Sequence, residues 1–532
     1  MSLKADRARP RVAVVGAGWA GLAAAFTLKR AGWDTEVFEQ SPILGGRARK
    51  AVIARRGLVL DNGQHLMLGA YRHTLELMRD IGVDANHALL RLPLQLTTLD
   101  GALHLAVNPA HPGPLRLPLA LLHMKGLSIG QKYILFRTLL QLQLTGWRMT
   151  PDATVLAWLQ KQRQPSTLIR LFWEPLCIAT LNTPIDNASM ALFAVVLRDS
   201  LAAGADASDL ILPRVDLSAL WPEVLAPQLM IHANTPVHGL SAVPGGYQLH
   251  TGNRSPRQLR QTPDNRDTAH DQGQEVKAVF DAVILATPAR MSHRLLSRLM
   301  PGQADNLSDT AITDDHAQHA RRDSDDQHQA ALAEKAALLE QLNAFQYHAI
   351  ATLTVFLAHA FPLPGCMYML KENRQAGHDG QWLFNRSRFM HPDTAIGSVD
   401  TASAGAATPD NTNDRFAHAI SIVISHADHL IGSDRDSVAN AILSQVRDQL
   451  PTGVTLPPVT GFELIMEKRA TFAATPGLAR PDRVTPWPGL FLAGDWTDTG
   501  YPGVLEGAVI SGLAAAQAAQ ALLASKSTNA TR

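Results

Sequence analysis

Three glycines near the start of the chain have the spacing of a dinucleotide-binding turn. Gly16, Gly18 and Gly21 follow a short β-branched run and lead into an Ala- and Leu-rich stretch that predicts a helix. In such a turn the first glycine allows a tight bend, the second lets the backbone approach a pyrophosphate, and the third lets the helix pack on the strand. Glu39 ends the next predicted strand, where a carboxylate can bind a ribose diol. The pattern predicts a dinucleotide site.

A secretory signal peptide is the alternative interpretation of the same apolar run, because arginines precede it. A signal peptide needs neither the glycine spacing nor the acidic residue, and we identify no small-residue cleavage site. The two cysteines, Cys177 and Cys366, form no disulfide framework and no metal cage, which favours a reducing compartment. The net charge of +1 gives no general attraction to nucleic acid. We expect a cytoplasmic protein without a metal site.

Two further stretches offer groups for a nucleotide. In "SPILGGRARK", Gly45 and Gly46 allow close backbone approach, and Arg47 can form two parallel hydrogen bonds to phosphate. The distal "GLFLAGDW" is a predicted buried strand that ends in Gly494 and Asp495. A glycine-bracketed helix start follows it, and a helix N-terminus favours an anion.

Together, these motifs with "ILATPA" and "LAGDW…EGA" resemble the FAD-dependent amine oxidase and phytoene desaturase superfamily. The resemblance implies FAD as the cofactor. It implies that the glycine turn and Arg47 hold the pyrophosphate, Glu39 the adenosine ribose and Asp495 the ribityl and phosphate region. It implies that the Val237 backbone meets the adenine, and that Leu505 and Glu506 approach the flavin pyrimidine edge. The expected FAD contacts are Gly16, Gly18, Trp19, Ala20, Gly21, Glu39, Gln40, Gly46, Arg47, Val237, Thr287, Gly494, Asp495 and Leu505.

The order of predicted elements indicates an α/β protein, α+β overall. A discontinuous Rossmann-like FAD-binding domain would contain an inserted substrate domain of mixed sheet and helices. The expected FAD-binding parts are 10–90, 229–300 and 466–524, and the substrate-domain parts are a helical 91–228 and a sheet at 336–465. Three segments too polar to bury much surface predict mobile insertions, at 253–275, 301–335 and 401–413, and residues 525–532 a disordered tail.

The substrate is indicated by a second resemblance. "LDNGQHLMLGAYRHTLELMRDIG" from Leu60, "FWEPLCIATLNTP" and the tail "GDWTDTGYPGVLEGAVISG" are similar to the squalene-associated branch, the hydroxysqualene dehydroxylases. That family converts hydroxysqualene to squalene with reduced flavin in bacterial hopanoid biosynthesis. An amine oxidase would flank the flavin with two aromatic rings. Here Tyr501 can supply one, and Val504 stands where the second would be.

A Leu-rich segment from Leu89 to Leu144 suits the wall of an apolar tunnel for a C30 isoprenoid. It equally suits an ordinary helical core, and the same residues can serve as both. Its "LRLPLALLHMKG" could also lie in a bilayer surface. We therefore expect a hydrophobic isoprenoid substrate and peripheral contact with the inner membrane face. The resemblance also implies squalene-synthase-like partner enzymes.

The proton donor has several candidates. His65 could donate near neutral pH, or it could simply be hydrogen-bonded to its turn. Asp61 suits a turn-shaping role, and Asp498 would need burial to raise its pKa. The candidate catalytic residues are His65, Asp61 and Asp498, with Asp495 and Glu506 as further carboxyls. Three other functions stay open at this point: a carotenoid-type desaturase, a flavin amine oxidase and a non-catalytic prenyl-binding escort.

Overall fold

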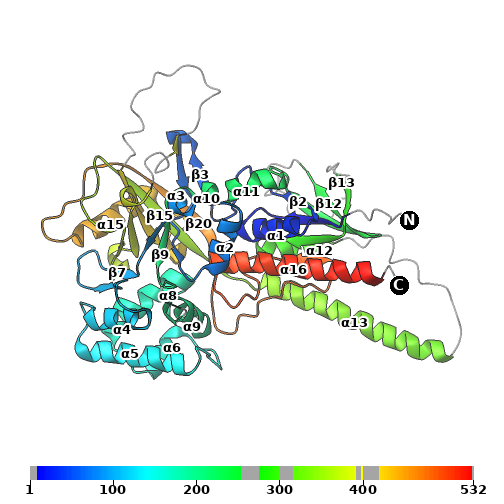
Figure 1. The fold of residues 1–532 in the computed structure, drawn as a ribbon, viewed down its shortest axis with the longest axis horizontal. Coiled ribbons are helices and arrows are strands. Elements are labelled where there is room, and N and C mark those ends of the chain that lie inside the picture. Colours follow the sequence, from blue (N-terminus) through cyan, green and yellow to red (C-terminus); the bar gives the residue numbers. More distant parts are fainter. Residues whose placement is uncertain are drawn as a thin grey trace, which may run out of the picture.

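The protein, seen in a computed structural model, has two unlike ends (Figure 1). A parallel sheet lies at one end, and an antiparallel sheet and a group of helices lie at the other. The structure describes residues 9–202, 204, 206–252, 275–299, 315–390, 397–398 and 418–529. The predicted α/β class, with helices and strands mixed, is confirmed.

The parallel sheet has the strand order β10-β2-β1-β14-β21. Its central strand carries Val12, Ala13 and Val14, all fully buried, because a parallel strand covered on both faces needs apolar residues at every position. The strands come from distant parts of the chain, as predicted for a discontinuous domain: β1 (Arg11–Val15), β2 (Asp34–Phe38), β10 (Met230–His232), β14 (Ala282–Leu285) and β21 (Leu490–Leu492).

Two long helices, α1 (Trp19–Arg30) and α16 (Leu505–Asn529), pack side by side against this sheet (Figure 1). A Cβ on Gly512 would lie 2.1 Å from the Ala20 carbonyl oxygen, so glycine permits the close approach. Within the described chain, α16 is the one helix long and apolar enough to cross a membrane by length and composition. Ala515 and Ala516 of this helix are fully buried, which identifies α16 as a core helix of the parallel-sheet end.

A small antiparallel sheet follows β10. Its strands are β11 (Val237–Val243), β12 (Gly246–Thr251) and β13 (Glu275–Phe280), and the turn between the first two was predicted. The sequence from Ala278 to Ala289 was expected to form one strand of the first sheet. The structure corrects this, because Asp281 divides the run: its N–H donates to the Arg11 carbonyl at 2.9 Å, and only β14 joins the parallel sheet.

The large antiparallel sheet has the order β16-β17-β19-β15-β20. Its strands are β15 (Tyr347–Leu357), β16 (Met367–Met369), β17 (Trp382–Asn385), β19 (His418–Ile424) and β20 (Val459–Phe472), and helix α15 (Arg435–Asp448) shares its core. Strands at Val355–Leu357, Trp382–Phe384 and Ile420–Ile424 were predicted and are confirmed. The expected domain border at residue 466 falls inside β20, which joins the two ends of the molecule as one strand.

The segment from 91 to 228 is less helical than predicted. Its main helices are α4 (Gly113–His123), α5 (Ile129–Leu144), α6 (Val155–Lys161), α8 (Glu174–Leu181) and α9 (Met190–Leu197). Short strands also occur here and just before it: β5 (Met67–Leu68), β6 (Leu89–Leu92), β7 (Gln95–Thr97), β8 (His104–Ala106) and β9 (Leu210–Pro213). The first strand–turn–strand after Glu39 is β3 (Lys50–Ile53) and β4 (Leu58–Asp61), and helix α2 (Arg72–Asp80) follows β5.

The mobile segment expected at 301–335 is wrong from residue 315 onward. Helix α13 (Asp315–Asn343) begins there and packs on α12 (Ala289–Ser297). A surface helix satisfies its own backbone and needs only a narrow apolar stripe, which Leu338 and Leu342 supply here. Low hydrophobicity therefore did not prevent an ordered helix.

The other polar segments lie mostly outside the described residues. The insertions expected at 253–275 and 401–413 lie outside the described residues, apart from Glu275, which begins β13. The disordered tail expected from residue 525 is wrong up to Asn529, because α16 continues to that residue.

Candidate active site

The first glycine turn follows β1 and leaves no room for side chains. Gly16 has φ +107°, and a Cβ on it would lie 2.5 Å from the Ala286 carbonyl oxygen. A Cβ on Gly21 would lie 1.9 Å from the Gly16 carbonyl oxygen. The turn therefore requires glycine at both positions, and it brings the N-terminus of α1 to the carboxyl edge of the sheet.

The second glycine pair packs directly on the first. Gly45 and Gly46 both have positive φ, and a Cβ on Gly46 would lie 2.9 Å from the Cα of Gly18. The Gly45 N–H donates to the Ala17 carbonyl at 2.9 Å. Bare backbone from two segments thus forms one cradle, which fits a pyrophosphate because its oxygens accept from backbone N–H groups.

Glu39 is buried at the end of β2, as the ribose role requires. Its carboxylate accepts hydrogen bonds from the N–H groups of Ala17 at 2.7 Å and Ser41 at 2.8 Å. The Thr235 N–H donates to the Glu39 carbonyl at 2.8 Å, which brings the start of β11, at Val237, to this edge. The neighbouring Gln40 is exposed.

Arg47 and Asp495 form an ion pair across the site. The second guanidinium nitrogen of Arg47 donates to the Ala470 carbonyl at 2.6 Å, so the side chain spans from the second glycine pair to β20. Asp495 is buried directly after β21. Thr287, which follows β14, accepts a hydrogen bond from the Trp496 indole at 3.1 Å through its carbonyl. The expected cofactor residues thus gather at the carboxyl ends of β1, β2, β14 and β21, where open α/β sheets bind ligands.

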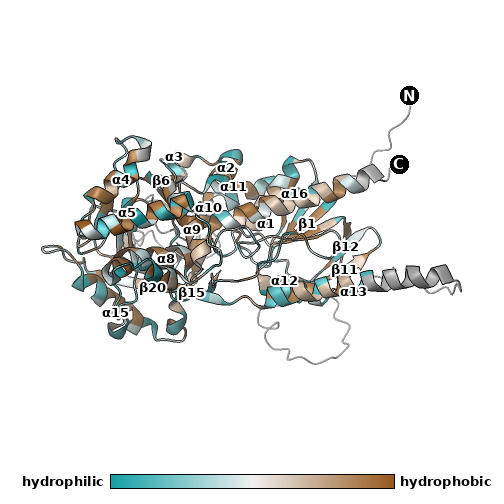
Figure 2. Ribbon diagram, turned by 90° about the horizontal axis from the view of Figure 1, so that it is seen from below, coloured by the Kyte–Doolittle hydropathy of each residue, from teal (hydrophilic) through white to brown (hydrophobic). Residues whose placement is uncertain are grey.

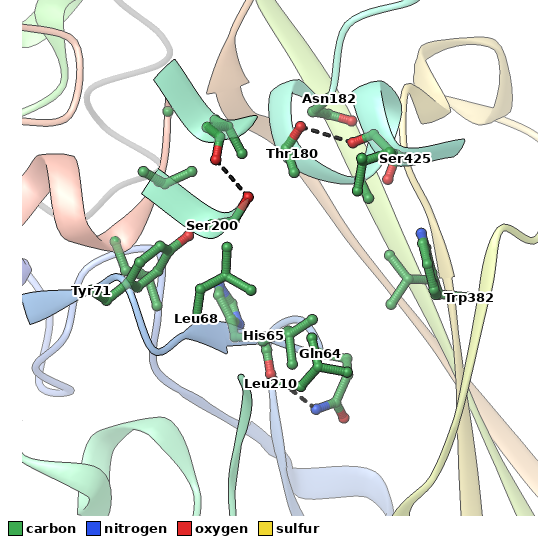
Figure 3. A pocket seen from close by; sticks show the side chains of 18 of the residues that line it. Gln64, His65, Leu68, Tyr71, Thr180, Asn182, Ser200, Leu210, Trp382 and Ser425 are labelled. Carbon is green, nitrogen blue, oxygen red and sulfur yellow. Dashed lines mark hydrogen bonds between the residues drawn. The ribbon is translucent and has the colours of Figure 1, made fainter. Parts of the chain in front are cut away.

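One pocket of about 340 Å³ begins at this edge and extends into the helical group. Near the nucleotide end it is lined by Trp19, Arg47, Asp495 and Leu505. Its far part is lined mainly by leucines of the predicted tunnel segment: Leu94, Leu96, Leu105, Leu117, Leu121 and Leu139. Most of these leucines are also core residues, so the segment both lines the pocket and forms part of the hydrophobic core. Figure 3 shows Tyr71 and Trp382 on opposite sides of the pocket.

The pocket contains few ionisable groups. Burial lowers the pKa of His65, and its Nδ1 contacts the Gly63 carbonyl at 2.9 Å. A carbonyl only accepts, so Nδ1 carries the proton and Nε2 is left as an acceptor. Burial and the nearby Glu506 carboxylate raise the pKa of Tyr71. Tyr71 therefore keeps its phenolic proton, and its hydroxyl has no hydrogen-bond partner among the described residues.

Three expected catalytic candidates lie elsewhere. Asp498 is exposed and does not line the pocket, so that assignment is wrong. Asp61 lies behind the lining: its carboxylate accepts from the Leu217 N–H at 2.8 Å, and burial raises its pKa to about 7 against the opposing charge of Arg386. Glu506 accepts from the N–H groups of His73 and Thr74 and so caps the start of α2.

The turn after Asp495 explains the position of Asp498. The Arg480 guanidinium donates to the carbonyls of Asp495, at 2.7 Å, and Tyr501, at 2.5 Å. The loop between these two residues therefore folds around the guanidinium. The Tyr501 hydroxyl donates to Asp199 at 2.5 Å, and Tyr501 does not line the pocket, whereas Val504 does. The tail therefore supplies no pair of aromatic rings facing the pocket.

Several lining residues were not predicted. Tyr71 and Asn182 stand within the two stretches that carry the second resemblance but were not singled out there, and no motif marks Trp382 or Glu467. A second group, outside this pocket, was also unexpected. His348 and Asp428, both among the described residues, are hydrogen-bonded at 2.9 Å, and the ligand atoms of these two residues and His426 lie within 4.8 Å of one another. The hydrogen bond and the T-shaped contact of the two imidazole rings account for this arrangement.

Comparisons with known proteins agree with this geometry. The protein-family model described as "Flavin containing amine oxidoreductase" matches residues 19–312 and 402–520. Hydroxysqualene dehydroxylase of Rhodopseudomonas palustris is 28% identical over 521 residues, which cover 95% of this chain and 97% of that protein. Zeta-carotene desaturase of Synechocystis sp. is 32% identical over 109 residues, 20% of this chain and 22% of that protein.

The fold also resembles that of solved structures. Cyclohexylamine oxidase of Brevibacterium oxydans superposes with a TM-score of 0.61 at 13% identity and covers 97% of this chain and 99% of that one. At that identity the likeness concerns the fold alone. Because the family model spans more than half of the chain, the protein belongs to the flavin containing amine oxidoreductase family and is an FAD-dependent oxidoreductase.

Proposed function

We propose that the protein removes the hydroxyl group of hydroxysqualene to give squalene. The observation that carries this proposal is the single pocket that joins the nucleotide edge to a leucine-lined interior. Such a lining suits a long hydrocarbon, because burial of each CH₂ contributes about 0.8 kcal/mol. The relative matched along nearly its whole length has this activity by name.

The residues at the nucleotide end fit FAD. Gly18 and Gly46 bring bare backbone together, with a Cβ on Gly46 only 2.9 Å from the Gly18 Cα, and the buried Glu39 carboxylate accepts from Ala17 of the same turn. Arg47 and Asp495 stand between this cradle and the pocket, where the phosphate and ribityl parts would pass. Reduced flavin, when bound, supplies a hydride to an electron-poor carbon.

The chain itself must help the hydroxyl leave and keep water out. The substrate alcohol is allylic, so its departure as water leaves a delocalised cation. Its oxygen needs one proton to leave as water, and we assign that proton to the Tyr71 hydroxyl, which is protonated before the step and lines the pocket with Leu68 and Leu505. The resulting phenolate regains a proton from solvent when the product leaves. His65, neutral through burial, offers an acceptor at Nε2 and acts as an orienting group for the substrate alcohol rather than as the acid. The leucine walls exclude the water that would capture the cation.

A single-turnover assay tests the function. The purified holoenzyme is reduced without oxygen and mixed with hydroxysqualene, and flavin reoxidation and squalene are measured together. Squalene formed in step with reoxidation supports the proposal. Reoxidation without squalene, or no reaction, contradicts it. Oxidised enzyme with a polyene precursor then tests a carotenoid-type desaturase, and oxidised enzyme with a primary amine tests an amine oxidase.

The setting of the reaction is part of the proposal. We propose a cytoplasmic protein that works at the inner membrane face and receives its substrate from a squalene-synthase-like enzyme. Both cysteines are free, which suits a reducing compartment. Co-purification of such an enzyme with the tagged protein from its own cells tests the partner.

A further inference from the structure

Helices α4 and α5 carry an unusual outer surface at the end of the molecule remote from the parallel sheet (Figure 1). Within the described residues, 13 large hydrophobic side chains are exposed, and seven of them lie between residues 115 and 144. Ile129 is 86% exposed and Leu144 79% exposed. Such clustering is rare on a surface that faces only water.

Helix α5 is apolar on two opposite faces. Its inner face buries Leu135, Leu139 and Leu142. Its outer face carries apolar residues spaced four, three, four and four apart, so they share one side of the helix: Ile129, Tyr133, Phe136, Leu140 and Leu144. An ordinary surface helix has polar residues there. We call this stripe, with Leu115 and Leu122 of α4, the outer face.

The chain segment that forms the outer face carries basic side chains and no acidic ones, although Arg116 is ion-paired with Asp206. Residues 101–151 contain no Asp or Glu, whereas the whole chain has 47 acidic and 48 basic residues. The basic side chains in this stretch are Arg116, Lys125, Lys132, Arg137 and Arg148. A symmetric contact with a second copy would place these cations against each other, whereas an anionic surface would neutralise them.

The outer face also lies directly over the apolar part of the pocket. Leu117 and Leu121 of α4 and Leu139 of α5 line that pocket from the inner side of the same two helices. Figure 2 shows α4 and α5 together at one end, with hydrophobic segments on both. A single helical layer therefore separates the pocket from whatever covers the outer face.

We propose that the outer face docks on an anionic lipid bilayer and that the substrate passes between the bilayer and the pocket through the α4–α5 layer. Exposed apolar side chains enter the acyl boundary while lysines and arginines meet the headgroups, which supplies the two signals that stable peripheral binding needs. The docking itself does not depend on the identity of the reaction.

Vesicle co-sedimentation tests the docking. The holoenzyme is mixed with vesicles of phosphatidylcholine, with or without phosphatidylglycerol. We expect binding to the anionic vesicles, and a loss of more than about tenfold in the triple variant Ile129→Gln, Phe136→Gln, Leu144→Gln. The matched control is Leu332→Gln, Ile431→Gln, Val484→Gln, which removes three apolar side chains that are 42–54% exposed elsewhere on the surface and should bind as the wild type. Unchanged flavin absorbance verifies that each variant is folded.

Charge is tested separately. Replacing Lys125, Arg137 and Arg148 with Gln should weaken binding about fivefold for each residue, on anionic vesicles only. Failure of the wild type to sediment, or equal binding by the triple apolar variant, overturns the proposal. So does a dimer in size-exclusion chromatography that this variant dissociates, because a second copy would then cover the face. Loss of vesicle binding with full turnover on detergent-dispersed hydroxysqualene separates the docking from the proposed function.

Discussion

The contact between the two glycine segments gives the sharpest prediction about FAD binding. Gly46→Ala has two costs that the structure separates. The φ of +65° disfavours a side chain by about 1–2 kcal/mol. The new Cβ would also stand 2.9 Å from the Cα of Gly18, and because this neighbour is backbone, the two segments must move apart. Forced packing of this kind costs about 1–3 kcal/mol.

Gly57→Ala is the matched control. Gly57 has φ +63°, almost the same backbone strain, but nothing lies within 4 Å of the Cβ it would gain. The difference between the two variants in the free energy of unfolding therefore isolates the close approach. We expect Gly46→Ala to weaken FAD binding by about 5- to 150-fold relative to Gly57→Ala, because 1.4 kcal/mol corresponds to a factor of ten.

The assay is titration of each apoprotein with FAD, followed by flavin fluorescence, with chemical unfolding of the same samples. If both variants bind FAD with the Kd of the wild type, the two glycine segments do not form the pyrophosphate cradle and the reasoning fails. If both lose affinity alike, backbone strain and not the close approach governs the site.

Three further predictions concern single side chains. Tyr71→Phe should lower single-turnover squalene formation by about 10²–10⁴-fold with the flavin spectrum unchanged; near-normal turnover would exclude Tyr71 as the donor. Burial raises the pKa of Asp61 from its ordinary 3.8 to about 7, so its ionised form destabilises the fold. Stability should fall as pH rises from about 4 to about 7, and Asp61→Asn should abolish that decline in urea unfolding measured across this range. Glu506→Gln should lower the free energy of unfolding by about 1–3 kcal/mol, because the charged cap of α2 is lost; an unchanged urea midpoint would contradict this.

The nucleotide end could be predicted because its signals are local. The spacing of Gly16, Gly18 and Gly21 and the position of Glu39 each depend on a strand, a turn and a helix that follow one another in the chain. The start of the last helix at Leu505 was predicted correctly for the same reason. Short-range steric rules fix such features whatever the rest of the chain does.

The pocket could not be predicted in the same way. Tyr71, which precedes α2, and Trp382 of β17 lie on opposite sides of one pocket (Figure 3), and no spacing in the sequence encodes that arrangement. Asp498 illustrates the converse error. It stands three residues after Asp495, yet the loop held by Arg480 sends it to the surface. Proximity along the chain predicted a shared site that the turn prevents.

The interleaved parallel sheet has a consequence for the order of folding. Its central strand β1 is synthesised long before its neighbour β14, and β21 and α16 follow later still. Asp495, which completes the site with Arg47, therefore leaves the ribosome 448 residues after Arg47. Contacts of such long sequence separation form slowly, so the nascent chain must wait with its sheet edge uncovered. In cells short of chaperones, this protein should therefore aggregate even while FAD is still plentiful.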